Sequence, residues 1–274
     1  MRLRKYLSGL KAIYWRKSEK IVSKKLLGIE LKVIDGTIRK EDYDDCWFYH
    51  LACNSEVFFD VGANIGQTSL LANLTKKVKR VVLVDPNPEA LIFAAKNLLL
   101  NNLASNCSFF SAFATEAIGD DVKFYTVGIG SAGSMYASHA ETARRLNNFF
   151  YVKTITIDYL MDYYQLVPDF VKVDVEGAEN ATLRGAVGLA TKKKTRFLVE
   201  MHVLKELSME QNGNQILDWT KKTGYKAWFL CNQAELKTGN DISHRGRCHL
   251  LLQPSEWPYP EFLMGIAESA PLPN

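Results

Sequence analysis

The chain has 274 residues, of which 47% are hydrophobic, and a formal net charge of +4. This size and composition are those of one large globular α/β domain with additions. No apolar run is long enough to cross a bilayer, and no signal-peptide core follows the basic residues at the N-terminus. The five cysteines have no framework spacing. They argue against a structural zinc site formed by cysteines and indicate a reduced, cytoplasmic location.

Residues 1–50 are predicted to form a basic helical extension that contains a short β element at 30–34 and a turn at Asp35-Gly36. Residues 1–25 carry nine basic side chains against one acid, Glu19, and their apolar residues follow helical spacing. A basic amphipathic helix suits peripheral contact with the inner face of a membrane or with an acidic glycan. Packing on the core, or on a second subunit in a homo-oligomer, is the alternative. No nucleic-acid partner is expected, because no known binding module surrounds the basic stretch.

Residues 57–70 have the pattern of a buried strand, a tight glycine turn and a helix start. Gly62 permits the sharp turn, and Gly66 permits close packing of the helix against the strand. Asn64 replaces the second glycine of a dinucleotide fingerprint and is one of the few residues that tolerate a positive φ. Asp60, just before the loop, would repel a pyrophosphate but suits a cationic amino group. The loop therefore favours S-adenosylmethionine over a nicotinamide cofactor.

A second buried strand, residues 80–85, ends in another acid, Asp85. Its distance from the glycine loop is close to that expected for a carboxylate that accepts hydrogen bonds from ribose hydroxyls. Pro86 and Pro88 end the strand, and residues 89–102 show helical spacing. The alternative role of Asp85 is to cap this helix.

Strands and helices then alternate, which indicates parallel strands with helices on both faces of the sheet. Strands are expected at residues 57–61, 80–85, 107–111, 170–175, 195–201, 225–230 and 246–252. An insert at about 112–157 holds two further strands, 122–127 and 152–157, around a Gly/Ser loop. Residues 253–274 contain five prolines and are predicted to be a loosely ordered tail. This order matches the Rossmann-like, seven-stranded class I methyltransferase sheet, in which one strand is antiparallel.

Four segments, taken in order, resemble the motifs of the FkbM family of methyltransferases. They are Val57 to Gly66, Val84 to Asn87, Val171 to Glu179 and Leu198 to His202. The resemblance covers about residues 56–202, within an expected methyltransferase domain at 51–252. Family members more often carry Glu where this chain has Asp85, and either carboxylate can bind ribose. The resemblance implies methylation that depends on S-adenosylmethionine, most often of a hydroxyl on a sugar or a secondary metabolite.

The residues expected to bind the cofactor lie at the carboxyl ends of the strands, where ligands bind in such sheets. They are Asp60, Gly62, Ala63, Asn64, Gly66, Thr68, Asp85, Pro86, Asn87, Ala112, Phe113, Ala114 and Asp174. The Gly/Ser loop of the insert is expected to cover the active site, and the alternative is a plain hairpin connection. The substrate-binding residues predicted in the insert are Ser131, Ser134, Met135 and His139.

Methyl transfer to a hydroxyl requires a base or a metal ion to remove the proton. His202 is the first candidate base because an ordinary imidazole is half neutral near pH 6.5. Asp174 and Glu176 could serve if burial raises their pKa values. Alternatively Asp174, Glu200 and a third oxygen ligand could hold a divalent ion. The purely structural alternatives are a hydrogen-bonded histidine at 202 and acids placed at 176 and 179 by a helix dipole.

The leading hypothesis is an O-methyltransferase that acts on a sugar hydroxyl of a glycan, glycolipid or glycosylated metabolite. Within the same class, the acceptor could be a non-sugar small molecule or an amine. The alternatives from other classes are a nicotinamide-dependent oxidoreductase and a non-catalytic binding module. Asn64 and the Asp-Val-Glu-Gly-Ala-Glu motif at 174–179 count against the oxidoreductase, and the intact acidic positions count against loss of activity.

Overall fold

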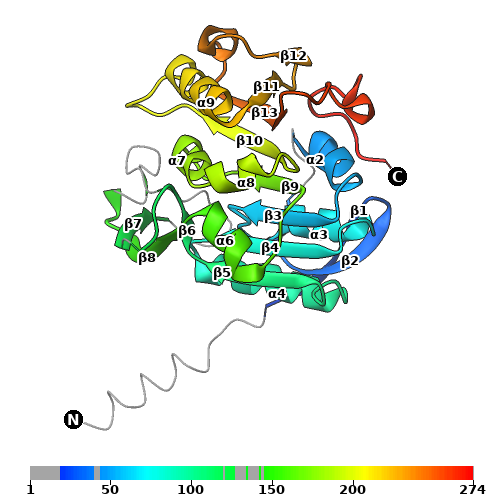
Figure 1. The fold of residues 1–274 in the computed structure, drawn as a ribbon. Coiled ribbons are helices and arrows are strands. Elements are labelled where there is room, and N and C mark those ends of the chain that lie inside the picture. Colours follow the sequence, from blue (N-terminus) through cyan, green and yellow to red (C-terminus); the bar gives the residue numbers. More distant parts are fainter. Residues whose placement is uncertain are drawn as a thin grey trace, which may run out of the picture.

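The computed structural model describes residues 19–39, 44–119, 121–126, 134, 142 and 145–273. Its main sheet is built from β3 (Val57–Val61), β4 (Arg80–Asp85), β5 (Cys107–Ser111), β9 (Phe170–Val173), β10 (Arg196–His202), β11 (Tyr225–Phe229), β12 (Ala234–Glu235) and β13 (Arg247–Pro254). The spatial order is β12-β11-β13-β10-β9-β3-β4-β5 (Figure 1). Strand β13 runs antiparallel between β10 and β11, whereas β5, β4, β3, β9 and β10 are mutually parallel.

This order is that of a class I methyltransferase sheet, and every strand predicted for it is present, with small differences at the ends. Strand β12, a short edge strand, was not predicted, because two residues give no periodic pattern. The order reverses between β3 and β9, so a ligand site is expected beyond the carboxyl ends of these two strands.

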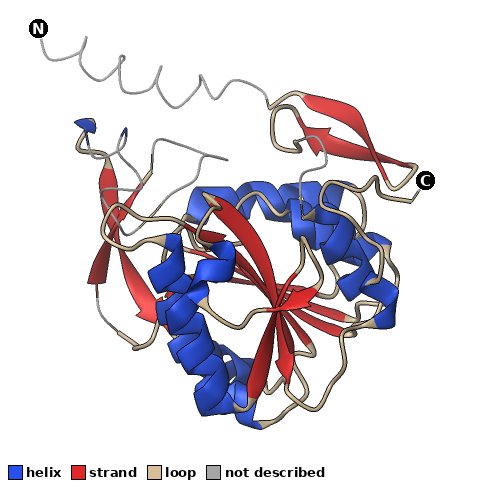
Figure 2. Cartoon of the chain, turned by 90° about the horizontal axis from the view of Figure 1, so that it is seen from above, coloured by secondary structure: helices blue, strands red, loops and turns tan. Residues whose placement is uncertain are grey.

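Helices cover both faces of the sheet (Figure 2). The first face carries α2 (Asp45–Ala52), α3 (Gln67–Leu74) and α4 (Pro88–Leu100). The opposite face carries α6 (Ile157–Tyr164), α7 (Glu179–Arg184), α8 (Val187–Thr191) and α9 (Met209–Thr223). Successive strand residues point to opposite faces, so Phe58 belongs to the first apolar cluster and Phe59 to the second. Short 3₁₀ turns are η1 (Gly239–Ile242) and η2 (Glu261–Leu263).

The predicted insert forms a separate three-stranded sheet. Its strands are β6 (Phe113–Ala114), β7 (Asp121–Tyr125) and β8 (Phe149–Ile155), in the order β6-β8-β7. Figure 1 shows β7 and β8 at one end of the main-sheet strands. Of the predicted substrate-binding residues, Ser131, Met135 and His139 lie outside the described residues.

The predicted N-terminal helix is wrong for residues 21–25, which form strand β1 (Ile21–Leu26). It pairs antiparallel with β2 (Ile29–Ile34), and this strand includes the predicted β element. The hairpin forms because Gly28 supplies a turn with positive φ and β2 docks on α4, where Asn97 Oδ1 accepts the Ile34 N–H at 3.0 Å. The rest of the predicted helix, residues 1–18, lies outside the described residues.

Both predicted boundaries of the domain need correction. The boundary at residue 50 divides α2, whose Trp47 and Phe48 are fully buried in the core. The C-terminal segment is not loosely ordered: Leu263 and Leu272 are buried, and Trp47 Nε1–H donates to the Ile266 carbonyl at 3.0 Å. Apolar residues between the prolines have α2 to pack against, which the sequence could not show. No helix in the described part of the chain is long and apolar enough to span a membrane.

Candidate active site

The loop between β3 and α3 has the backbone that its sequence predicts. Gly62, Asn64 and Gly66 all have positive φ angles of 87°, 47° and 79°. A Cβ atom on Gly62 would lie 1.7 Å from the carbonyl oxygen of Asp174, so only glycine permits this approach of two strand ends. A Cβ on Gly66 would lie 2.7 Å from Ala94 Cβ, so Gly66 allows close packing against α4 rather than against its own strand.

Asp85 ends β4 directly beside this loop. Its two carboxylate oxygens accept the backbone N–H groups of Asn64 and Asn87, each at 2.8 Å. Burial raises the pKa of Asp85 to about 6, although these hydrogen bonds act in the opposite direction. The cap of helix α4 is Asn87, whose Oδ1 accepts the Glu89 N–H at 3.0 Å. The helix-cap alternative for Asp85 is therefore wrong, and its carboxylate faces the cavity described next.

A cavity of about 270 Å³ opens at these strand ends. The residues predicted to bind the cofactor that line it are Gly62, Ala63, Asn64, Thr68, Asp85, Pro86, Asn87, Ala112, Phe113, Ala114 and Asp174. Glu176 lines it as well. The cavity thus joins the end of β4 to the turn after β9, as expected at a position where the strand order reverses.

Asp60 and Gly66, also predicted to bind the cofactor, are not among the lining residues. Asp60 is buried, and its Oδ2 accepts hydrogen bonds from the hydroxyls of Thr68 and Ser69, both at 2.6 Å. The carboxylate of Asp60 therefore holds the first turn of α3 against β3 and does not line the cavity, where it was expected to contact the amino group of the cofactor. The sequence shows the charge of Asp60, but the two hydroxyl groups reach its carboxylate only because α3 folds back beside β3.

The N-terminal region contributes a wall of the cavity that was not predicted from the sequence. Gly36, Thr37 and Arg39 line the cavity together with Gln67. Gln67 Oε1 accepts the backbone N–H of Arg39 at 3.1 Å, which joins this segment to α3. The turn signal at Asp35-Gly36 was the only local hint, because no pattern relates residue 39 to a loop almost thirty positions later.

The end of the cavity that follows β9 is lined by the acids Asp174 and Glu176 and by a buried lysine, Lys172. Its ammonium lies 2.9 Å from Asp174 Oδ2. Burial raises the pKa of Asp174 to about 7; Glu200 acts in the same direction, and Lys172 opposes it. Asp174 therefore exists as both acid and carboxylate near neutral pH, which is what a general base requires. Ser134, one of the predicted substrate contacts, is buried, donates to the Glu176 carbonyl at 2.8 Å and is not among the residues that line the cavity.

His202 is surrounded by carboxylates. Its Nδ1 lies 2.8 Å from Glu179 Oε1, and its Nε2 lies 3.5 Å from Glu176 Oε2 and 3.6 Å from Glu200 Oε1. Burial would lower the pKa of His202, but the carboxylates outweigh it and raise this pKa to about 11. The imidazole is therefore protonated at neutral pH and cannot act as the base predicted from its ordinary pKa.

Glu200 occupies the centre of this charged region. Its Oε1 lies 3.0 Å from Arg247 Nη1, and its Oε2 lies 3.7 Å from Lys172 Nζ. Burial would raise the pKa of Glu200, but the surrounding cationic groups outweigh it and hold the pKa below its usual range. Glu200 is thus a fixed carboxylate that holds cations in place. Fully buried Glu179, which also accepts the Gly177 N–H at 2.8 Å, was not predicted as a site residue.

These features define an S-adenosylmethionine-dependent methyltransferase of the class I fold. The model of the methyltransferase FkbM domain matches residues 60–227, which is more than half of the chain. The chain belongs to the FkbM methyltransferase family, as its motifs indicated, and this excludes the nicotinamide oxidoreductase and the non-catalytic module. The family implies S-adenosylmethionine as cofactor, and the glycine cradle and Asp85 fit it.

Comparison with solved structures finds similar chains at low identity. The FkbM methyltransferase from Methylobacillus flagellatus KT is 21% identical over 73% of this chain, with a TM-score of 0.45, and this chain spans 44% of its length. A SAM-dependent methyltransferase from Agrobacterium tumefaciens is 10% identical and has a TM-score of 0.46, with 86% of this chain and 71% of that chain covered. No curated protein matches the sequence.

Proposed function

We propose that this enzyme methylates a hydroxyl of a sugar in a glycan, a glycolipid or a glycosylated metabolite. One observation carries the proposal: a single cavity joins the buried carboxylate of Asp85 to the carboxylates of Asp174 and Glu176. The first suits the ribose of the cofactor. The other two suit an acceptor that has several hydroxyl groups.

Asp85 would accept hydrogen bonds from ribose hydroxyls while its backbone contacts hold the loop in place. The N–H groups of Gly62 and Ala63 donate to the Val84 carbonyl at 2.9 and 3.0 Å, which holds the backbone of the loop against the end of β4, where it lines the cavity. When bound, the cofactor supplies a methyl group on a sulfonium. The guanidinium of Arg39, which lines the same cavity, suits the carboxylate of the methionine part.

Asp174 is the group best suited to remove the hydroxyl proton. Its pKa of about 7 allows it to accept a proton at neutral pH. Lys172, 2.9 Å away, holds the carboxylate in one orientation. His202, protonated and bound by Glu179, contributes a fixed positive charge and orients Glu176 and Glu200. Much of the catalysis would then come from holding the acceptor oxygen in line with the methyl carbon.

The alternative acceptor is an amine or another non-sugar molecule. The carboxylates of Asp174 and Glu176 would attract an ammonium group as readily as they accept hydrogen bonds from hydroxyls. An ammonium must also lose a proton before it can attack the methyl group, so the same base would serve. The acidic character of the cavity end therefore keeps the amine as the second candidate.

Mass spectrometry of glycans, lipids and small metabolites from cells with and without the protein tests the proposal. We expect loss of a methyl group, 14 Da, from one sugar, restored by the wild-type enzyme but not by Asp174→Asn. Purified enzyme should then release S-adenosylhomocysteine with that sugar as acceptor. If the methyl group is lost only from amines, the acceptor is an amine and the sugar proposal is wrong. An unchanged methylation profile would contradict both proposals.

A further inference from the structure

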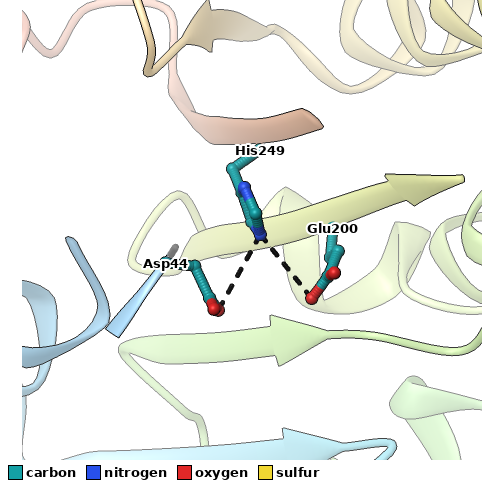
Figure 3. Close-up of side chains that lie close together, drawn as sticks. All are labelled: Asp44, Glu200 and His249. Atoms are coloured by element: carbon teal, nitrogen blue, oxygen red, sulfur yellow. Dashed lines mark ion pairs between the residues drawn. The ribbon is translucent and has the colours of Figure 1, made fainter. Parts of the chain in front are cut away.

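A second group of ionisable side chains shares Glu200 with the charged region around His202, and none of its members is among the residues that line the cavity. Asp44 immediately precedes α2, Glu200 lies on β10, and His249 lies directly opposite it on β13. These three side chains, here called the buried triad, converge on one point (Figure 3). Their exposed fractions are only 3%, 4% and 2%. The triad brings together segments that are far apart in the sequence, so no motif indicated it.

The contacts within the buried triad are too long for hydrogen bonds. His249 Nε2 lies 3.6 Å from Glu200 Oε2 and 3.9 Å from Asp44 Oδ2, whereas a hydrogen bond requires about 2.7–3.2 Å. Among the described residues, neither Asp44 Oδ2 nor either ring nitrogen of His249 has a hydrogen-bond partner. Buried polar atoms without partners are costly, and the described residues supply these atoms only with the longer ion-pair contacts.

The spacing instead suits three ligands of one metal ion. The three ligand atoms all lie within 4.8 Å of one another. The distances from His249 Nε2 to the two carboxylate oxygens, 3.6 and 3.9 Å, are close to the separation of roughly 3.3–3.6 Å between ligand atoms of a tetrahedral ion with Zn–N and Zn–O bonds of about 2.0–2.2 Å. An ion there would satisfy Asp44 Oδ2 and His249 Nε2 together, which a single proton on the imidazole cannot do.

We propose that Asp44, Glu200 and His249 bind a divalent first-row transition-metal ion, with Zn²⁺ the best match. An imidazole nitrogen favours such an ion over Mg²⁺ or Ca²⁺, which prefer oxygen ligands. A fully buried site has little room for the several waters that Mg²⁺ retains, whereas Zn²⁺ accepts four ligands.

Lys172 is the cation already near these oxygens. Its Nζ lies 3.5 Å from Asp44 Oδ2 and 3.7 Å from Glu200 Oε2, but 2.9 Å from Asp174 Oδ2. An ion in the buried triad would compete with Lys172 for the first two oxygens and leave its nearest contact, with Asp174, in place. The ion would thus stabilise the junction of α2, β10 and β13 and leave Lys172 to orient the proposed base.

This site differs from the other possible set of ligands, Asp174, Glu200 and His202. In that set, His202 Nδ1 already lies 2.8 Å from Glu179 Oε1, and its Nε2 faces Glu176 and Glu200. Both ring nitrogens of His202 thus have partners, whereas neither ring nitrogen of His249 has a hydrogen-bond partner among the described residues. The buried triad is therefore the better site, and it implies a structural rather than a catalytic ion.

Equilibrium dialysis of the full chain against micromolar Zn²⁺, after chelator treatment, tests the proposal. We expect one ion per chain and a rise in melting temperature on loading, because binding to the folded state stabilises it. His249→Gln and the nearly isosteric Asp44→Asn should each weaken Zn²⁺ binding by about tenfold or more. His244→Gln, which changes an exposed histidine near the start of the same strand, should bind as wild type does.

Wild-type chain loaded with Zn²⁺ provides a measurement that does not depend on whether the variants fold. X-ray absorption should report one nitrogen and at least two oxygen ligands at the ion. No stoichiometric binding by the wild type, sulfur ligands in the spectrum, or equal binding by wild type, His249→Gln and Asp44→Asn would each overturn the proposal. If the wild-type chain binds one Zn²⁺ ion but transfers no methyl group to a sugar, the result supports the metal site and counts against the proposed function alone.

Discussion

Asp174 and His202 lie at the ends of neighbouring strands, yet their charge states near neutral pH differ. Burial brings the pKa of Asp174 up to about 7, whereas three carboxylates bring the pKa of His202 to about 11. A side chain's ordinary pKa therefore predicts the wrong base here, and the surrounding charges decide which residue can accept a proton.

The pH dependence of methyl transfer should identify the base. If Asp174 accepts the proton, kcat should rise with pH through about 7 and then level off, because the carboxylate form is complete above its pKa. Asp174→Asn should lower kcat by about 10²-fold or more and abolish the rise, with cofactor affinity unchanged within a few fold. Asp162→Asn, at an exposed position of α6, is the control. A rate that still increases above pH 9 would point to a base with a higher pKa.

His202 is predicted to act mainly on stability. Because His202→Gln removes the positive charge from Glu179, Glu176 and Glu200, it should lower the free energy of unfolding by about 3–5 kcal/mol. The pKa is raised on folding, so the stabilisation is complete below pH 6.5 and is lost as pH rises towards 11. Urea unfolding across this range provides the measurement. Partial recovery in the double variant with Glu179→Gln is expected, and its absence would contradict the ion-pair account.

Asp85 is predicted to control cofactor affinity. Asp85→Ala should weaken binding of S-adenosylmethionine and S-adenosylhomocysteine by roughly 1.5–3 kcal/mol, the range for hydrogen bonds to charged groups. Wild-type affinity should fall as pH drops below about 6, since the carboxyl is then protonated. Calorimetry checks both effects, with exposed Glu89→Gln as control and NAD as a ligand that should not bind. Equal affinity of the wild type and Asp85→Ala for S-adenosylmethionine would show that Asp85 does not bind the cofactor.

At the scale of elements, the β3–α3 loop depends on how closely two strand ends approach each other. Gly62→Ala would combine a Cβ 1.7 Å from the Asp174 carbonyl with a φ of +87°. Strain of this kind costs about 1–3 kcal/mol, and the displaced loop should also bind the cofactor more weakly. Gly246→Ala, which has open space around it and no positive φ, is the matched control. The melting temperature and the cofactor affinity are measured by thermal unfolding and calorimetry. Wild-type values of both for Gly62→Ala would refute the close approach of Gly62 to the Asp174 carbonyl.

At the scale of the whole molecule, the two ends of the described chain pack on the same side of the sheet. Residues of β2, α2 and the C-terminal segment share one apolar cluster with α3 and α4. These segments therefore belong to the domain and do not extend from it. The position of α2 also places Asp44, directly before the helix, in the buried triad. The part of the chain that resembles the family thus depends on flanking segments for one face of its core.

Leu263→Ala tests this arrangement. Its side chain is fully buried against the cluster, so the variant should lose about 2–5 kcal/mol of unfolding free energy. Met264→Ala, at the next position but exposed, should change stability little. Denaturant unfolding of the two variants checks the expectation. Similar stabilities would mean that the C-terminal segment does not pack on the core in solution.

The sequence by itself determined the sheet and the cofactor loop. Strand periodicity, the glycines at 62 and 66 and the acid at the end of β4 are local signals, because each is set by the backbone needs of a few neighbouring residues. For the same reason the family motifs identified the enzyme class. Ambiguous local patterns gave wrong predictions. The apolar spacing at 21–25 predicted a helix, but these residues form a hairpin that docks on α4.

Only the tertiary structure decided how the charged residues act. Asp60 contacts hydroxyls on α3, His202 is held protonated by carboxylates from the turn after β9, the first turn of α7 and its own strand, and Asp44 meets residues more than 150 positions later. Electrostatic energy depends on distance and burial, which the order of residues along the chain does not specify. The sequence therefore placed the acids at the site, and folding assigned their roles.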